Sequence, residues 1–128
     1  MNISISHPTC FDFENELYEP IKNSSRLKGH NFYFPEDRVQ NTRTVIRNCD
    51  LMIADVSYPS TGTGIEIGWA STVNKPIYCI YKEGHTYSFA LKFITSNFYE
   101  YNDDNLTKVI AQIIEDYSKI APPPKYED

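Results

Sequence analysis

The stretch from Asp50 to Ala70 constrains the fold of this chain more than any other part of its sequence. It begins with an apolar run over residues 51–56, whose length suits a strand buried on both faces. A cluster of serine, proline and glycine follows over residues 57–64, and it breaks regular structure while bringing backbone N–H groups close together. Beyond it, apolar residues recur at helical spacing. This order predicts strand, loop and helix, the geometry of an anion or ribose site at the carboxyl end of a parallel sheet.

The rest of the chain repeats this alternation. Strands are expected at residues 2–6, 30–34, 50–56, 77–81 and 98–101, and helices at residues 13–21, 36–48, 64–73, 87–95 and 106–120. Such alternation indicates a three-layer α/β fold, flavodoxin-like or Rossmann-like, with a five-stranded parallel sheet in the order 2-1-3-4-5 and helices on both faces. Residues 1–120 are expected to form one domain, and residues 121–128 a frayed tail.

The charge of the chain limits its partners. A net charge of −5 argues against a nucleic-acid polymer, because binding a phosphate backbone requires a basic face. A single nucleotide needs only a local pocket of donors. Cys10, Cys49 and Cys79 show no metal-type spacing, so no metal is expected, and no cofactor either. With no apolar run of membrane-spanning length and no leader at its start, the chain is expected to be cytoplasmic, away from membranes.

Candidate site residues gather where two neighbouring strands of this sheet end. Strands 2–6 and 50–56 are adjacent in the expected order, and ligands of such folds bind above their carboxyl ends. His7 follows the first strand, and the serine- and glycine-rich loop follows the second. Asp55, near the end of the second strand, is expected to hold the loop by accepting its N–H groups. Glu66, in the expected first turn of the next helix, either stabilises that helix or takes part in chemistry above the sheet.

The loop resembles the signature of the nucleoside 2-deoxyribosyltransferase-like superfamily, and more closely its branch of 2'-deoxynucleoside 5'-monophosphate N-hydrolases. That branch has the pattern Pro-Ser-x-Gly-x-Gly-x-Glu-x-Gly-x-Ala, and every fixed position is present from Pro59 to Ala70. The resemblance implies that Glu66 is the nucleophile that attacks the anomeric carbon and forms a glycosyl-enzyme intermediate. The chemistry agrees, because a carboxylate is a good partner for an oxocarbenium-like centre.

The same resemblance implies a phosphate site. Ser60 stands where the hydrolases have a phosphate-binding serine and the transferases an aspartate for the nucleoside 5'-hydroxyl. With Thr61 and the N–H groups of Gly62 and Gly64, it would bind a 5'-phosphate. Ser88 matches a second phosphate-binding serine, which the family supplies from the neighbouring subunit, so a homodimer with a shared active site is implied. On residue type alone, Ser60 would be a turn residue and Ser88 a helix cap.

The sequence departs from this family at its second acid. The hydrolases carry an aspartate on the helix before strand 50–56, and in ungapped register Thr42 takes its place. Three residues are the alternatives for proton transfer: Asp37 or Glu36 from a shifted helix, or His7 as a general acid. A histidine at such a place more often hydrogen-bonds a turn.

Together these features predict a hydrolase that cleaves the N-glycosidic bond of (deoxy)nucleoside 5'-monophosphates, with a small nucleotide or nucleoside as its ligand. Two alternatives stay open. One is a nucleoside 2-deoxyribosyltransferase, which moves the sugar between bases. The other is a nucleotide-binding module of the same fold that has no turnover.

Overall fold

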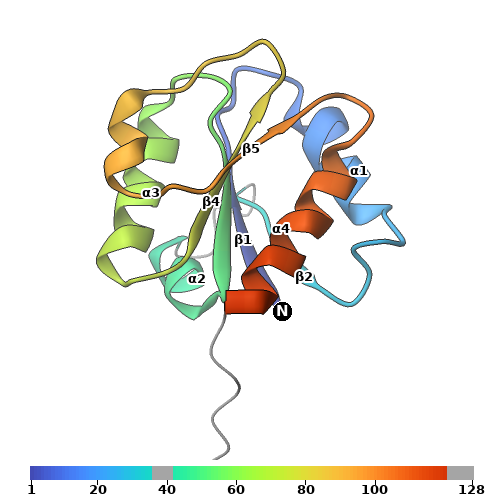
Figure 1. The fold of residues 1–128 in the computed structure, drawn as a ribbon, viewed down its shortest axis with the longest axis horizontal. Coiled ribbons are helices and arrows are strands. Elements are labelled where there is room, and N and C mark those ends of the chain that lie inside the picture. Colours follow the sequence, from blue (N-terminus) through green and yellow to red (C-terminus); the bar gives the residue numbers. More distant parts are fainter. Residues whose placement is uncertain (36–41, 121–128) are drawn as a thin grey trace, which may run out of the picture.

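The computed structural model describes residues 1–35 and 42–120 and contains a five-stranded, parallel sheet. The strands are β1 (Asn2–Ser6), β2 (Asn31–Tyr33), β3 (Leu51–Asp55), β4 (Ile77–Lys82) and β5 (Phe98–Tyr101). Their order is β2-β1-β3-β4-β5, which confirms the topology expected from the sequence (Figure 1).

Helical segments cover both faces of this sheet. They are η1 (Glu14–Tyr18), α1 (Glu19–Lys22), α2 (Thr42–Asn48), α3 (Thr61–Thr72), η2 (Phe89–Phe93) and α4 (Leu106–Ile120). η1 is a π-helical turn that continues into α1, and η2 is a 3-10 turn. α1 and α4 lie on one face of the sheet, and α2 and α3 lie on the other (Figure 1).

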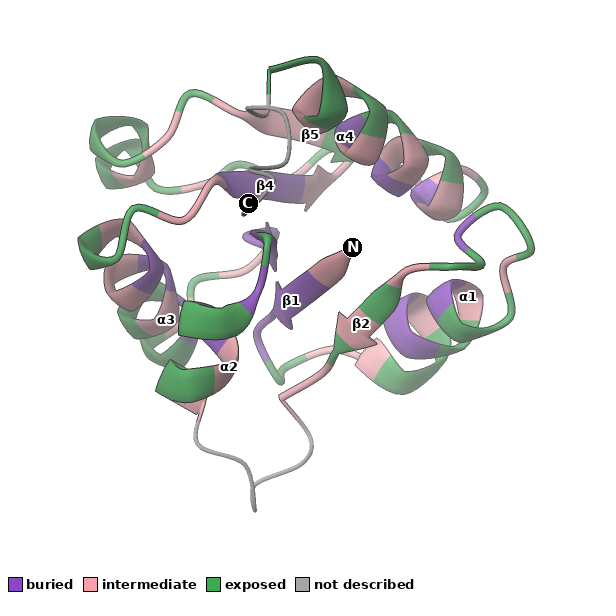
Figure 2. Cartoon of the chain, turned by 90° about the horizontal axis from the view of Figure 1, so that it is seen from below, coloured by how far each residue is buried: buried purple, intermediate pink, exposed green. Residues whose placement is uncertain are grey.

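The alternation of side chains along the strands divides the core into two halves. In a strand, successive side chains point to opposite faces of the sheet. On β3, Leu51 and Ile53 pack on the side of α1 and α4, whereas Met52 and Ala54 pack on the side of α2 and α3. Every residue of β3 is buried, as its apolar run predicted. Figure 2 shows the same pattern on the helices, whose buried residues face the sheet.

Two expected elements are much shorter in the structure, and a third is described only in part. The helix expected over residues 87–95 is only the 3-10 turn η2, none of whose residues is fully buried, so little packing supports a longer helix. The strand expected over residues 30–34 is the three-residue β2. Of the helix expected over residues 36–48, α2 accounts for Thr42–Asn48; residues 36–41, like the expected tail 121–128, lie outside the described residues. Within residues 1–35 and 42–120, no helix is long and apolar enough to cross a membrane.

Candidate active site

The loop after β3 opens directly into α3, and the helix starts earlier than the sequence suggested. Ser60 is its N-cap, in an extended conformation, and the Ser60 side-chain oxygen accepts a hydrogen bond from the Thr63 N–H at 3.2 Å. Gly62 and Gly64 therefore lie within the first turn, and a Cβ added at either would have no contact closer than 4.0 Å. The two glycines are therefore not required by close packing of their neighbours.

The early start of α3 moves Glu66 into the second turn. The expectation of a first-turn glutamate is therefore wrong, since α3 begins at Thr61 and has no acidic residue in its first turn. The field of a helix terminus falls off within one turn, so the N-terminus of α3 supports the charge of Glu66 less than expected.

The Glu66 side chain is half-buried and faces β1 and α2. It lines a small cavity of about 20 Å³ together with Thr42 and Tyr33. Burial raises the pKa of the Glu66 carboxyl, while the nearby Ser6 hydroxyl acts in the opposite direction. A buried carboxylate with a raised pKa is a feature shared by many catalytic groups.

Thr42 lies beside Glu66, at the place the family resemblance assigned to a second acid. Both side chains border the same small cavity. The ungapped alignment that puts Thr42 at the family's second acid therefore agrees with the structure. Thr42 offers a hydroxyl there and no ionisable group. Asp37 and Glu36, the alternative acids, lie outside the described residues.

His7 is buried on the other side of β1. Its Nδ1 lies 2.7 Å from the Pro8 carbonyl oxygen and its Nε2 lies 2.6 Å from the Tyr18 hydroxyl. The carbonyl can only accept, so we assign the ring proton to Nδ1 and let Nε2 accept from Tyr18. The ring packs against Phe11 and Phe13. His7 thus makes the turn contact that histidines at such a place usually make, and its catalytic role stays a prediction.

A second cavity, of about 600 Å³, lies between the start of α3 and the segment around η2. Its walls are mainly apolar, and they include Ser60, Thr63, Gly64 and Ser88. The structure therefore brings both predicted phosphate-binding serines to one cavity within one chain. Ser88 is also the N-cap of η2, where its hydroxyl oxygen accepts from the Ala90 N–H at 3.3 Å. Glu66 is not among the residues that line this cavity.

Sequence reasoning missed Thr63, which occupies a variable position of the signature. Thr63 is 4% exposed, and its hydroxyl is buried without a hydrogen-bond partner. An unsatisfied buried hydroxyl in a cavity wall is a site for a polar ligand group or a water. A still larger hollow, of about 740 Å³, borders residues 21–25 and 27–34. It contains none of the candidate residues, so we do not place the site there.

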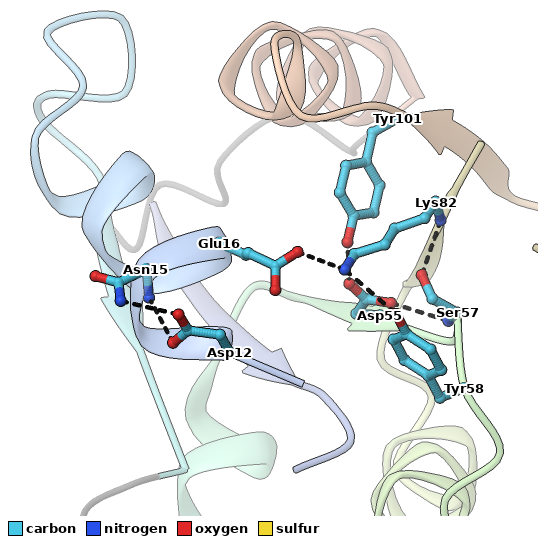
Figure 3. A network of polar contacts seen from close by, with 8 residues as sticks. All are labelled: Asp12, Asn15, Glu16, Asp55, Ser57, Tyr58, Lys82 and Tyr101. Atoms are coloured by element: carbon cyan, nitrogen blue, oxygen red, sulfur yellow. Dashed lines mark hydrogen bonds and ion pairs between the residues drawn. The ribbon is translucent and has the colours of Figure 1, made fainter. Parts of the chain in front are cut away.

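Asp55 holds the start of the loop, as expected. One carboxylate oxygen accepts from the Ser57 N–H at 2.9 Å, and the other accepts a short hydrogen bond from the Tyr101 hydroxyl (Figure 3). Burial and the adjacent Asp55 carboxylate raise the pKa of Tyr101 far above its usual value. This pair joins the carboxyl ends of β3 and β5.

Lys82 ties the same loop to η1. Its ammonium lies 2.6 Å from Glu16 and 3.5 Å from the Tyr58 hydroxyl (Figure 3), and it also faces the ring of Phe11 at 4.6 Å. Burial acts to lower the pKa of Lys82, but Glu16 and Tyr58 reverse that effect and leave it raised. The ion pair is a further contact that the sequence did not reveal.

Comparison with known proteins finds similarity to proteins that are named for acting on nucleosides and nucleotides. The family described as nucleoside 2-deoxyribosyltransferase matches residues 6–118. A stretch of 39 residues is 49% identical to a protein of Syntrophotalea carbinolica whose name assigns it as 2'-deoxynucleoside 5'-phosphate N-hydrolase 1. That stretch covers 30% of this chain and 28% of the relative, so the match spans less than a third of that protein.

Solved structures share the fold. The structure of the CMP N-glycosidase BcmB from Clostridium botulinum matches with a TM-score of 0.60 and 26% identity, over 90% of this chain and 99% of that chain. CapF, solved with the inhibitor 3-isopropenyl-tropolone, matches with a TM-score of 0.50 and 10% identity, over 80% of this chain and 30% of that chain. At such low identity, the likeness to CapF is one of fold alone.

Proposed function

This chain belongs to the nucleoside 2-deoxyribosyltransferase family, and from that premise we propose that it hydrolyses the N-glycosidic bond of (deoxy)nucleoside 5'-monophosphates. The observation that carries the proposal is the position of Glu66. It is a half-buried carboxylate with a raised pKa, six residues after the serine that caps α3, at the carboxyl edge of a parallel sheet. That edge is where ligands of such sheets bind.

Glu66 acts as the nucleophile in a reaction of two steps. In the first, a Glu66 oxygen bonds to C1' of the sugar while the C1'–N bond breaks, and the base leaves with the bonding electron pair. In the second, a water oxygen bonds to C1', the ester bond to Glu66 breaks, and the carboxylate is restored. The net reaction adds a hydroxyl to the sugar and a proton to the base.

Asp37 and His7 are our candidates for moving that proton. Both ring nitrogens of His7 already have partners, so it would have to release Tyr18 or Pro8 to act as an acid. Asp37 precedes α2, the helix whose first residue, Thr42, borders the cavity of Glu66.

The N-terminus of α3 is the proposed place for the 5'-phosphate. Free N–H groups at the start of a helix and its dipole favour an anion. Ser60, Thr61, Gly62 and Gly64 belong to this N-terminus, and a Cβ at either glycine would have no contact closer than 4.0 Å. The cavity that contains Ser60 and Ser88 extends from this point.

A homodimer is part of the proposal: Ser88, which lines the cavity of Ser60 in its own chain, would lie at the subunit interface and also reach the site of the neighbouring subunit. Support comes from large apolar side chains exposed near Ser88. Phe89 is 68% exposed, Phe93 82% and Ile94 41%. Exposed aromatic side chains that cluster in this way are typical of a protein contact.

Two other functions compete with this proposal. Transfer of the sugar to a second base fits the family equally well. A binding module without turnover is favoured by one observation, the hydroxyl of Thr42 in place of an acid beside Glu66.

The decisive experiment measures free base released from a panel of nucleosides and nucleoside 5'-monophosphates. We expect Glu66→Gln to lower the rate by roughly 10³-fold or more, since it removes the nucleophile but keeps the side-chain shape. Glu115→Gln is the matched control, because Glu115 is an exposed glutamate on α4, paired with Lys119.

Each alternative gives a different result in this assay. Unchanged base release by Glu66→Gln would show that Glu66 is not the nucleophile. A new nucleoside formed when a second free base is added would identify a transferase. Monophosphate binding by calorimetry without any base release would identify a binding module.

A further inference from the structure

The alternation of side chains on β1 places Ser6 and His7 on opposite sides of the sheet. Ile3 and Ile5 belong to the core half under α1 and α4. Ser4, the residue between them, lines the small cavity with Glu66. The period of two therefore directs Ser6 to the same side as Ser4, toward α2 and α3. The contact of His7 with Tyr18, which packs with Ile3 and Ile5, agrees with this alternation.

The Ser6 hydroxyl is sealed inside the protein without a regular hydrogen-bond partner. Ser6 is 0% exposed, and its Oγ meets no protein group with the geometry of a regular hydrogen bond. A buried hydroxyl in that state is destabilising, and it calls for an explanation. Its acidic neighbour is Glu66, whose ionised form it favours.

We propose that Ser6 is a positioning residue, whose hydroxyl donates to the Glu66 carboxylate and holds it turned toward the sugar. The inference rests on the proposed role of Glu66 and adds to it a residue that lies outside the loop signature. A hydroxyl can donate one proton to a carboxylate, and a hydrogen bond to a charged group is stronger than a neutral one. One oxygen of Glu66 would be fixed by Ser6, and the other would remain for attack on C1'.

Ser4, Tyr33 and Thr42 also bring hydroxyls to the cavity of Glu66, but Ser6 is the group whose hydroxyl favours the ionised carboxylate. The remaining walls of the cavity come from β1, β2, α2 and the segment after β2, and Tyr33 is the one titratable side chain among them. Arg43 of α2 lies over the ring of Trp69. His7 points to the other side of the sheet, and α3 itself has no acidic residue in its first turn. Within residues 1–35 and 42–120, Ser6 is therefore the group that opposes the effect of burial on Glu66.

The experiment follows the Glu66 carboxyl directly, so that it does not depend on activity. The full chain is labelled with ¹³C-glutamate, the Glu66 carboxyl signal is identified by its loss in Glu66→Gln, and its pH titration is recorded by NMR. In Ser6→Ala we expect the Glu66 midpoint to move to higher pH, because the ionised form loses its donor. Thr63→Val is the matched control: it also removes a buried hydroxyl without a partner, but on the wall of the other cavity, and it should leave the Glu66 midpoint in place.

Two further measurements separate positioning from folding and from the proposed function. Ser6→Ala should keep the fold and lower the unfolding temperature only slightly, because it leaves the half-buried Glu66 carboxylate without its donor. It should lower kcat/KM about three- to tenfold on the acidic limb of the pH profile, and by less at higher pH. An unmoved Glu66 midpoint in Ser6→Ala would overturn the inference. A moved midpoint in a protein that releases no base would uphold the contact and reject the proposed function instead.

Discussion

Ser60 combines two roles at the scale of a single residue. Its side-chain oxygen caps α3 through the Thr63 N–H, and the same N-terminus is the proposed phosphate site. Both roles use helix N–H groups, which explains why a serine suits the position: it caps the helix without adding charge. The pattern that identifies Ser60 is local, so it was visible in the sequence. The cavity that Ser60 shares with Ser88 could not be predicted from the sequence.

Ser60→Asp separates the two roles of this residue. Aspartate caps helices as well as serine does, so the melting temperature should change little. The added carboxylate repels a 5'-phosphate, and we expect KM for monophosphates to rise on the order of tenfold while KM for nucleosides does not rise. Steady-state kinetics on a matched nucleoside and monophosphate pair measure this. Equal effects on both substrates would place the phosphate elsewhere.

At the scale of secondary structure elements, the Asp55–Tyr101 pair joins two strands that are not neighbours. β4 lies between β3 and β5 in the sheet, and the hydrogen bond joins the two outer strands of this trio at their carboxyl ends. The loop that begins at Ser57 is held by the same carboxylate. The pair thus stabilises the edge of the sheet on which the proposed site depends.

Tyr101→Phe should remove about 1–3 kcal/mol from the free energy of unfolding at neutral pH, because it leaves a buried carboxylate oxygen without its donor. The pH dependence follows from the raised pKa of Tyr101, whose ordinary value is 10.0. Loss of the phenol proton is harder in the folded than in the unfolded protein, so the stabilisation is complete below pH 10 and is lost as the pH rises above it.

Urea unfolding between pH 7 and pH 11 measures both effects. The wild-type protein should lose stability above pH 10 more steeply than Tyr101→Phe. Tyr33→Phe, at a more exposed tyrosine on β2, is the control. Parallel pH profiles for wild type and Tyr101→Phe would contradict the assignment.

At the scale of the whole molecule, two large exposed apolar side chains lie together on η2. Phe89 and Phe93 of η2 are largely exposed, and their rings pack edge-to-face on each other at 5.7 Å. They lie next to Ser88, Ala90 and Leu91, which line the cavity of about 600 Å³ beside α3. A partner subunit at this surface would cover the aromatic rings and bring a second polypeptide close to the proposed phosphate site.

Phe93→Glu tests this surface. A charge in place of an 82% exposed ring should cost the folded monomer little, but it should shift a dimer toward monomers by at least about tenfold in dissociation constant. Analytical ultracentrifugation measures the change, and base release should fall with it if Ser88 acts across the interface. Ile120→Glu is the control, because Ile120 is 75% exposed and lies at the end of α4, on the opposite face of the sheet.

The sequence by itself determined the elements, the sheet order and the position of the loop signature. Those features rest on local patterns: the apolar run of β3, the apolar stripe of α4, and the prolines and glycines that end helices and strands. Its errors were local as well. Helix length was overestimated at η2, where no residue of the segment is fully buried. The start of α3 was placed too late, because the glycines that suggested a loop are tolerated in an N-terminal turn.

Only the tertiary structure decided which side chains meet. Asp55 and Tyr101 are 46 residues apart, Lys82 and Glu16 are 66 residues apart, and no local pattern links them. Ser6 looked like an ordinary residue of an alternating strand. It became a candidate partner of Glu66 only when the parallel pairing set β1 beside β3, and α3 brought its carboxylate to the same face of the sheet. Sequence periodicity specifies the face on which a side chain lies, whereas packing specifies what it meets there.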